Sequence, residues 1–183
     1  MLTHHGLSRY LKEILDIIEK KVWYKRAIVY TLLALITMLS IYVRALPGMK
    51  WGIELHGNDP WIAFWETKYV LENGLLSWWS LTPDNPDTHI FWYPIGRDFA
   101  STDYPGIALW TASTYPLAEL FGLTLKEWLA LQPLLFTALS TITIFFTLRE
   151  LLNGSNIAGL VGSLLYAIVP ATSDRTIVGF VEK

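Results

Sequence analysis

The sequence predicts an all-α membrane protein whose spans are connected by one long outer loop. Three observations support this class. The chain has 183 residues, of which 52% are hydrophobic and nine are Trp, more apolar side chains than a soluble domain of this length usually carries. Uncharged apolar segments of membrane-spanning character recur along the chain. An acidic, aromatic segment after the first of them is too long to be a simple connection.

Composition also excludes several classes of protein. The formal net charge is −2, so no basic face is available for nucleic acid, and we expect no nucleic-acid partner. Cys is absent, which excludes disulfides and thiolate metal sites. The first 26 residues are charged and helical in pattern, which is not typical of a cleavable signal peptide.

Residues 1–26 are predicted to form a cytoplasmic amphipathic helix. Their apolar side chains recur at intervals of three and four, which lines one helical face: Leu7, Tyr10, Leu11, Ile14, Leu15, Ile18 and Val22. Such a helix lies in the bilayer interface or packs on a partner, and the span that follows at once favours the interface.

The first membrane span is predicted over residues 27–46. No charge interrupts the chain between Arg26 and Arg44, and with its flanks the segment approaches the roughly 20 residues needed to cross. Basic residues crowd its N-terminal side, so the positive-inside rule places the N-terminus in the cytoplasm and residue 47 onward outside.

Residues 47–126 are predicted to be a large external loop with helices. Asp59 and Pro60 are interpreted as the N-cap and first position of a helix that ends near Asn73, with Gly74 beyond it. Residues 105–122 are apolar but short and contain Pro and Glu, so we expect them to stay in the outer loop, with a crossing as the alternative.

Two further spans are predicted at residues 127–148 and 155–172, with a cytoplasmic turn at 149–154. Small residues in the third span suit close contact between helices. If residues 105–122 do not cross, the external segment 173–183 emerges on the same side as Asp59. If they do cross, the acids of the two segments lie on opposite sides and cannot share a metal ion.

Asp59, Arg175 and Glu182 are the candidate site residues. Hard divalent cations such as Mg²⁺ and Mn²⁺ take carboxylate oxygens together with substrate phosphate, and an Arg can hold a phosphate oxygen. The structural alternative is that Asp59 only caps its helix, Arg175 pairs with Asp174, and Glu182 is a solvated acid. The residues alone leave both interpretations open.

Several motifs together resemble a known family. They are HGNDPW followed by a helix, then FWYPIGR, then TDYPG, and finally SDRTIVGFVEK at residues 173–183. In order and spacing, over about residues 40–183, they resemble the first outer loop and second acidic motif of the catalytic subunit of oligosaccharyltransferase. The chain is similar to the N-terminal part of that subunit, and we expect the archaeal single-subunit type.

The resemblance implies a multi-span glycosyltransferase of the GT-C type with its active site on the external face. It implies transfer of an oligosaccharide from a polyprenyl or dolichyl (pyro)phosphate carrier to Asn of Asn-x-Ser/Thr, with inversion. The implied cofactor is Mn²⁺ or Mg²⁺, with Asp59 and Glu182 as metal ligands and Asp59 and Arg175 as catalytic residues. The implied location is the cell membrane, or the endoplasmic reticulum membrane in a eukaryote.

The sequence also departs from the family pattern. Glu182 stands where Asp is common, and neither the later outer-loop acid nor the Trp-Trp-Asp acceptor motif is present, so this chain by itself is expected to be inactive. Two alternatives remain: another GT-C enzyme that uses a polyprenyl-phosphate sugar, or a non-catalytic membrane subunit. His56 is predicted to be a surface residue, and Asp98 and Asp103 are predicted to cap loops.

Overall fold

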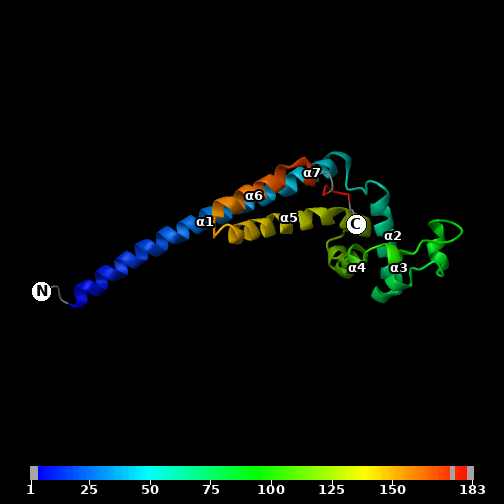
Figure 1. The fold of residues 1–183 in the computed structure, drawn as a ribbon, viewed down its shortest axis with the longest axis horizontal. Helices are drawn as coiled ribbons and strands as arrows, with labels where there is room; N and C mark the ends of the chain where they lie inside the picture. The colour runs from blue at the N-terminus through cyan, green and yellow to red at the C-terminus, as the bar shows by residue number, and fades with distance from the viewer. Residues whose placement is uncertain (1–3, 174–175, 181–183) are drawn as a thin grey trace. The chain divides into compact units, whose positions relative to one another are not determined.

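A computed structural model describes residues 4–173 and 176–180, with side chains from residue 25 onward. These residues form helices and no strand, which confirms the all-α class. The α-helices are α1 (His4–Trp51), α2 (Asn58–Asn73), α3 (Phe99–Thr102), α4 (Gly106–Glu119), α5 (Leu125–Leu151), α6 (Asn156–Ile168) and α7 (Pro170–Ser173) (Figure 1). Two 3₁₀-helices, η1 (Leu75–Ser80) and η2 (Pro86–Ile90), lie between α2 and α3.

Two helices of the described chain are long and apolar enough to cross a membrane, Lys25–Trp51 of α1 and Leu125–Leu151 of α5. The predicted amphipathic segment and the first span form one continuous helix, because neither Gly nor Pro occurs between residues 7 and 46. Large apolar side chains such as Leu35 and Met38 are exposed along α1, as expected where a helix faces lipid.

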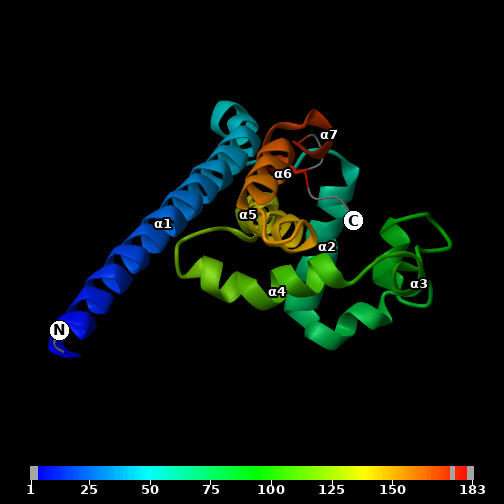
Figure 2. The ribbon, with the colours of Figure 1, turned by 60° about the vertical axis from the view of Figure 1, so that its left-hand side comes forward.

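The described chain divides into two compact units. The first contains the residues up to Ser40 together with Ala138–Ile168, and in it α1, α5 and α6 lie side by side (Figures 1 and 2). Buried hydroxyls connect the three helices: Thr141 Oγ1 donates to Ser40 Oγ over 3.2 Å, and Ser163 Oγ donates to the Thr141 carbonyl oxygen over 2.9 Å. Such bonds satisfy polar groups that lipid cannot satisfy.

The α6 helix is shorter than the predicted third span. It ends at Ile168, and α7 begins two residues later at Pro170. Proline lacks an N–H group and disfavours helical geometry in the residue before it, which explains the break at Val169. The membrane boundaries proposed for residues 127–148 and 155–172 stay a prediction.

The second unit contains Ile41–Thr137 and the described residues from Val169 onward. In it α4 packs against α2, and two bonds connect α4 to the start of α5. Gln132 Nε2 donates to Thr111 Oγ1 over 2.7 Å, and Trp128 Nε1 donates to Thr114 Oγ1 over 2.9 Å. Residues 106–119 therefore fold with the segment that carries Asp59, and their placement outside the membrane stays a prediction.

The start of α2 corrects one prediction. The helix begins at Asn58, Gly57 occupies the N-cap position with φ of 92°, and no side chain caps the helix. Asp59 lies within the first turn, so its assignment as the N-cap is wrong. The C-terminal end is as predicted: Gly74 has φ of 93° and its N–H donates to the carbonyl oxygen of Val70.

Candidate functional site

The C-terminal segment Ile177–Phe180 is hydrogen-bonded to three segments that are distant in sequence. The Val178 N–H donates to the Arg44 carbonyl oxygen over 3.1 Å, at the end of α1. The Gly179 N–H donates to the Ala130 carbonyl oxygen over 2.9 Å, in α5. The His56 N–H donates to the Gly179 carbonyl oxygen over 2.8 Å. The segment that begins the HGNDPW motif therefore lies beside the described end of the SDRTIVGFVEK motif, just before α2. These two are called the motif-bearing segments below.

Gly179 is required at this junction for two reasons. Its φ is +80°, a conformation that side chains rarely adopt. A Cβ there would overlap the carbonyl oxygen of Glu54 and lie 2.9 Å from Cδ2 of His56. The backbones approach so closely that no other residue fits without displacement.

His56 is half-buried at the same contact. Its Nε2 atom is buried, with no hydrogen-bond partner among the described residues. The prediction of a surface histidine is therefore wrong. The imidazole faces the C-terminal segment three residues before Asp59 and belongs to the candidate site.

Arg44 was not recognised from sequence, because a basic residue at the end of a span usually extends into water. In the structure it is fully buried. Its Nε donates to Thr176 Oγ1 over 2.6 Å and its Nη2 donates to Thr172 Oγ1 over 3.2 Å. The guanidinium therefore binds Thr172 and Thr176, which lie on either side of residues 174–175 in the sequence, and the Arg44 carbonyl oxygen accepts from the Val178 N–H.

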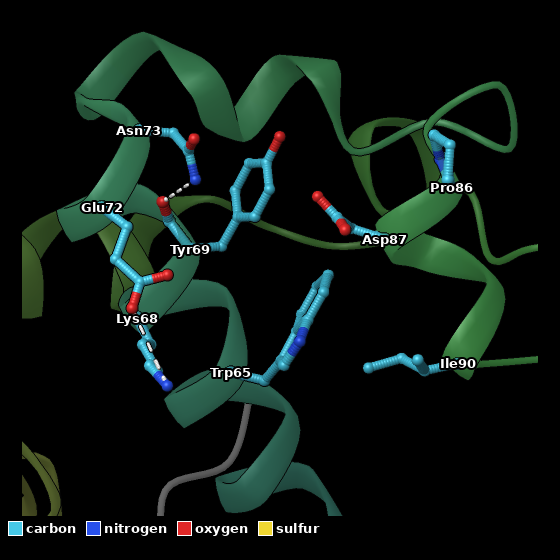
Figure 3. Close-up of a pocket in the computed structure, with 8 residues that line it drawn as sticks. All are labelled: Trp65, Lys68, Tyr69, Glu72, Asn73, Pro86, Asp87 and Ile90. Carbon is cyan, nitrogen blue, oxygen red and sulfur yellow. Dashed lines mark hydrogen bonds and ion pairs between the residues drawn. The ribbon is translucent and has the colours of Figure 1, made fainter.

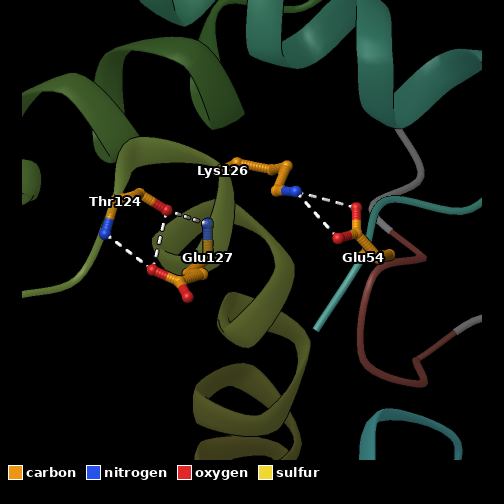
Figure 4. Close-up of polar contacts among 4 residues, drawn as sticks. All are labelled: Glu54, Thr124, Lys126 and Glu127. Atoms are coloured by element: carbon orange, nitrogen blue, oxygen red, sulfur yellow. Dashed lines mark hydrogen bonds and ion pairs between the residues drawn. The ribbon is translucent and has the colours of Figure 1, made fainter. Parts of the chain in front are cut away.

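Two polar arrangements hold the start of α5 (Figure 4). Thr124 and Glu127 form a capping box, in which Glu127 Oε2 accepts from the Thr124 N–H over 2.8 Å and from its hydroxyl over 2.7 Å. Lys126 Nζ contacts both oxygens of Glu54 over 2.9 and 2.8 Å. This ion pair attaches α5 to the segment between α1 and α2 that also carries His56.

Asp59 is exposed in the first turn of α2, where the helix dipole favours a carboxylate. No hydrogen bond or ion pair to its side chain is found within residues 4–173 and 176–180. Carboxylate oxygens are of the type that Mg²⁺ and Mn²⁺ prefer. Arg175 and Glu182 lie outside the described residues. Within the described ranges, no three His, Asp or Glu side chains form a metal cluster.

Asp98 caps a helix, as predicted, whereas Asp103, also predicted to cap a loop, forms an ion pair with Arg97. Asp98 caps α3 by accepting from the Ser101 N–H over 3.2 Å. Asp103 accepts from Arg97 over 2.8 Å, in a pair whose side chains are only 7% and 18% exposed, respectively. The Arg97 guanidinium also lies over the Phe99 ring at 4.7 Å. The YPIGR and YPG elements thus fold onto each other.

A pocket of about 300 Å³ lies between α2 and η2 (Figure 3). Its lining residues are Trp65, Lys68, Tyr69, Glu72, Asn73, Pro86, Asp87 and Ile90. The Trp65 ring already packs on Tyr69, Phe91 and Phe99, with centroid distances of 5.8, 4.9 and 5.4 Å. The indole therefore belongs to the aromatic core of the loop, and the candidate site remains at Asp59.

Comparison with known proteins identifies the family. The family model described as "Oligosaccharyl transferase STT3, N-terminal" matches residues 24–183. The chain belongs to the STT3 oligosaccharyl transferase family. This membership confirms the resemblance and fits an all-α membrane protein of the GT-C type.

Similar curated proteins come from plants and yeast. The Arabidopsis thaliana protein "Dolichyl-diphosphooligosaccharide--protein glycosyltransferase subunit STT3B" is 26% identical over 81% of this chain and 20% of its own length. The Oryza sativa subunit STT3A is 27% identical over 82% of this chain and 18% of its own. The Schizosaccharomyces pombe subunit stt3 is 24% identical over 81% and 19%. The chain therefore spans about a fifth of the length of these STT3 relatives.

Proposed function

We propose that this chain forms the N-terminal part of a metal-dependent, inverting oligosaccharyltransferase. The full-length protein transfers a glycan from a dolichyl or polyprenyl (pyro)phosphate to the amide nitrogen of Asn in Asn-x-Ser/Thr. The reaction takes place on the external face of the membrane. The protein resides in an archaeal cell membrane or in a eukaryotic endoplasmic reticulum membrane. Membership of the STT3 family and the similarity to dolichyl-diphosphooligosaccharide–protein glycosyltransferase subunits support this proposal.

The observation that carries the proposal is the contact between the two motif-bearing segments. Hydrogen bonding of Gly179 to His56 and Ala130 brings the second motif to the entry of α2, where the Asp59 carboxylate is exposed. In this proposal Asp59 binds the cation and faces the acceptor amide, Glu182 supplies a second oxygen ligand, and Arg175 holds a phosphate oxygen. A divalent cation at this site would neutralise negative charge on the leaving phosphate.

The test is glycosylation of a sequon peptide by the full-length protein, with and without Mn²⁺, for the wild type and Asp59→Asn. We expect activity only for the wild type with the cation, because an amide is a much poorer ligand for a hard cation than a carboxylate. Equal activity in all four reactions would overturn the metal-site proposal.

Two alternative functions give different results in the same assay. A GT-C enzyme that uses another acceptor would show no peptide glycosylation but would still consume a polyprenyl-phosphate sugar in a cation-dependent way. A non-catalytic subunit would do neither, and Asp59→Asn would change nothing.

A further inference from the structure

A second pocket, of about 340 Å³, lies within the first compact unit, among α1, α5 and α6. It is lined by Arg26, Val29, Tyr30, Arg149 and Asn156. Two guanidinium groups, a phenol and an amide therefore converge there, and no carboxylate is among the described lining residues. This donor set is typical of a site for a phosphate group.

The turn between α5 and α6 brings these side chains together. The Gly154 N–H donates to the Arg149 carbonyl oxygen over 2.8 Å, and Asn153 and Gly154 have φ of 54° and 78°. The chain therefore reverses within a few residues, and Asn156 starts α6 beside Arg149. The positive N-terminal end of the α6 dipole lies at the same place and also favours an anion.

Arg149 is only partly used by the fold. Its Nε is buried and has no hydrogen-bond partner within the described part of the chain. Its one ion pair there is Nη1 to Glu150 Oε1 at 3.8 Å, and the Glu150 side chain is 73% exposed. An exposed ion pair with this separation contributes little to the stability of the fold. A buried N–H group without a partner is costly, so an acceptor in the pocket would satisfy it.

The pocket also lies where a lipid headgroup would be. Arg26 is close to the start of the candidate span Lys25–Trp51, and Arg149 is close to the end of Leu125–Leu151. Both helix ends are on the side that the positive-inside rule assigns to the cytoplasm. Basic pockets between helices on that side suit anionic headgroups.

From these observations we propose that the pocket binds a phosphate group, held by Arg26 and Arg149 with Tyr30 and Asn156 as further donors. The group is the phosphodiester of an anionic phospholipid of the cytoplasmic leaflet or the phosphate of a soluble ligand. The proposal does not depend on the glycosyltransferase function, since all residues lining the pocket belong to the first compact unit and Asp59 belongs to the second.

The lipid arm of the test uses the full-length protein in vesicles of phosphatidylcholine with phosphatidylglycerol. The protein is extracted, washed in about 1 M NaCl, where the Debye length is about 3 Å, and the retained lipids are quantified by mass spectrometry. We expect the wild type to retain phosphatidylglycerol selectively. Arg149→Gln and Arg26→Gln should each lower retention about fivefold or more. Arg26 is exposed, so its variant tests the site even if Arg149→Gln does not fold.

Lys25→Gln is the matched control, because it removes one charge from the same helix end without lining the pocket. We expect its retention to change less than about twofold, since diffuse attraction is screened by salt. The soluble arm measures the thermal unfolding midpoint of delipidated protein in inorganic phosphate against chloride at equal ionic strength. A rise in the wild type that Arg149→Gln abolishes would identify a soluble phosphate as the ligand.

Retention of phosphatidylglycerol alone would identify the lipid as the source. Absence of both effects, or equal behaviour of Lys25→Gln and Arg149→Gln, would overturn the proposal. Lipid retention and the unfolding midpoint are measured independently of peptide glycosylation. Failure of the phosphate-site proposal is therefore distinguishable from failure of the proposed function.

Discussion

The His56 N–H donates a hydrogen bond to the Gly179 carbonyl oxygen across 123 residues of sequence, and the two backbones are in direct contact. Gly179 has φ of +80° and no room for a Cβ beside Glu54. The junction therefore depends on the absence of a side chain at one position. The junction joins the segment before Asp59 to the segment that leads to Glu182, the two acids that we propose as metal ligands.

Gly179→Ala should separate these segments. The new Cβ must displace the Glu54 carbonyl, so we expect the His56 amide to exchange with deuterium at least about tenfold faster, which corresponds to about 1.4 kcal/mol. Peptide glycosylation by the full-length protein should fall with it. Hydrogen exchange of peptides covering residues 53–58 measures the opening directly.

Gly52→Ala is the control for Gly179→Ala. Gly52 has φ of +90°, but no atom lies within 4 Å of the place that a Cβ would take, so this variant carries the backbone strain without the clash. Gly52→Ala should lower the free energy of unfolding by no more than about 1 kcal/mol. If both variants exchanged at the same rate at His56, steric contact with Glu54 would not be what holds the junction.

The buried pair of Arg97 and Asp103 should be far more important than an exposed pair. Removal of one partner leaves a charge in a site that is 7–18% exposed, so Arg97→Ala should destabilise the loop by about 3 kcal/mol. Arg97→Lys should recover only part of this, since a lysine lacks the planar group that lies over Phe99. Hydrogen exchange across residues 88–103 is the measurement.

The exposed pair Lys68–Glu72 is the control for Arg97. Its atoms are 3.7 Å apart and its side chains are 59% and 62% exposed, so Lys68→Ala should cost less than about 0.5 kcal/mol. Equal protection in the Arg97→Ala and Lys68→Ala variants would contradict the structural role given to Arg97.

Two glycines of α6 should respond differently to Ala. A Cβ at Gly159 would lie 2.7 Å from the Phe145 carbonyl oxygen and 2.7 Å from its ring, so Gly159→Ala must move a backbone and should cost about 1–3 kcal/mol. A Cβ at Gly162 meets mainly the flexible end of Leu148, which can rotate away. Gly162→Ala should be close to neutral, because Ala also favours the helix. Thermal unfolding in detergent distinguishes the two, and equal losses would show that α6 is not held by close backbone contact.

Local patterns predicted much of the fold. The uncharged segment after Arg26, the helix that ends before Gly74 and the capping by Asp98 follow from rules that act within a few residues. The contact of Gly179 with Glu54 was not predictable, because a glycine that permits a close approach between distant segments has the same local signature as a turn glycine. Burial of Arg44 was not predicted either, because its partners Thr172 and Thr176 follow more than 120 residues later in the sequence.

Asp59 and Asp98 should show opposite behaviour, and this separates catalysis from folding. Asp59 caps nothing, so Asp59→Ala should change stability by no more than about 0.5 kcal/mol while it abolishes cation-dependent glycosylation. Asp98 does cap α3, so Asp98→Ala should cost about 1 kcal/mol and leave most activity intact. Activity and unfolding of the full-length variants, measured in the same detergent, give both values. A stability loss in Asp59→Ala as large as that in Asp98→Ala would make Asp59 a structural residue, whereas an active, stable Asp59→Ala would remove it from the site altogether.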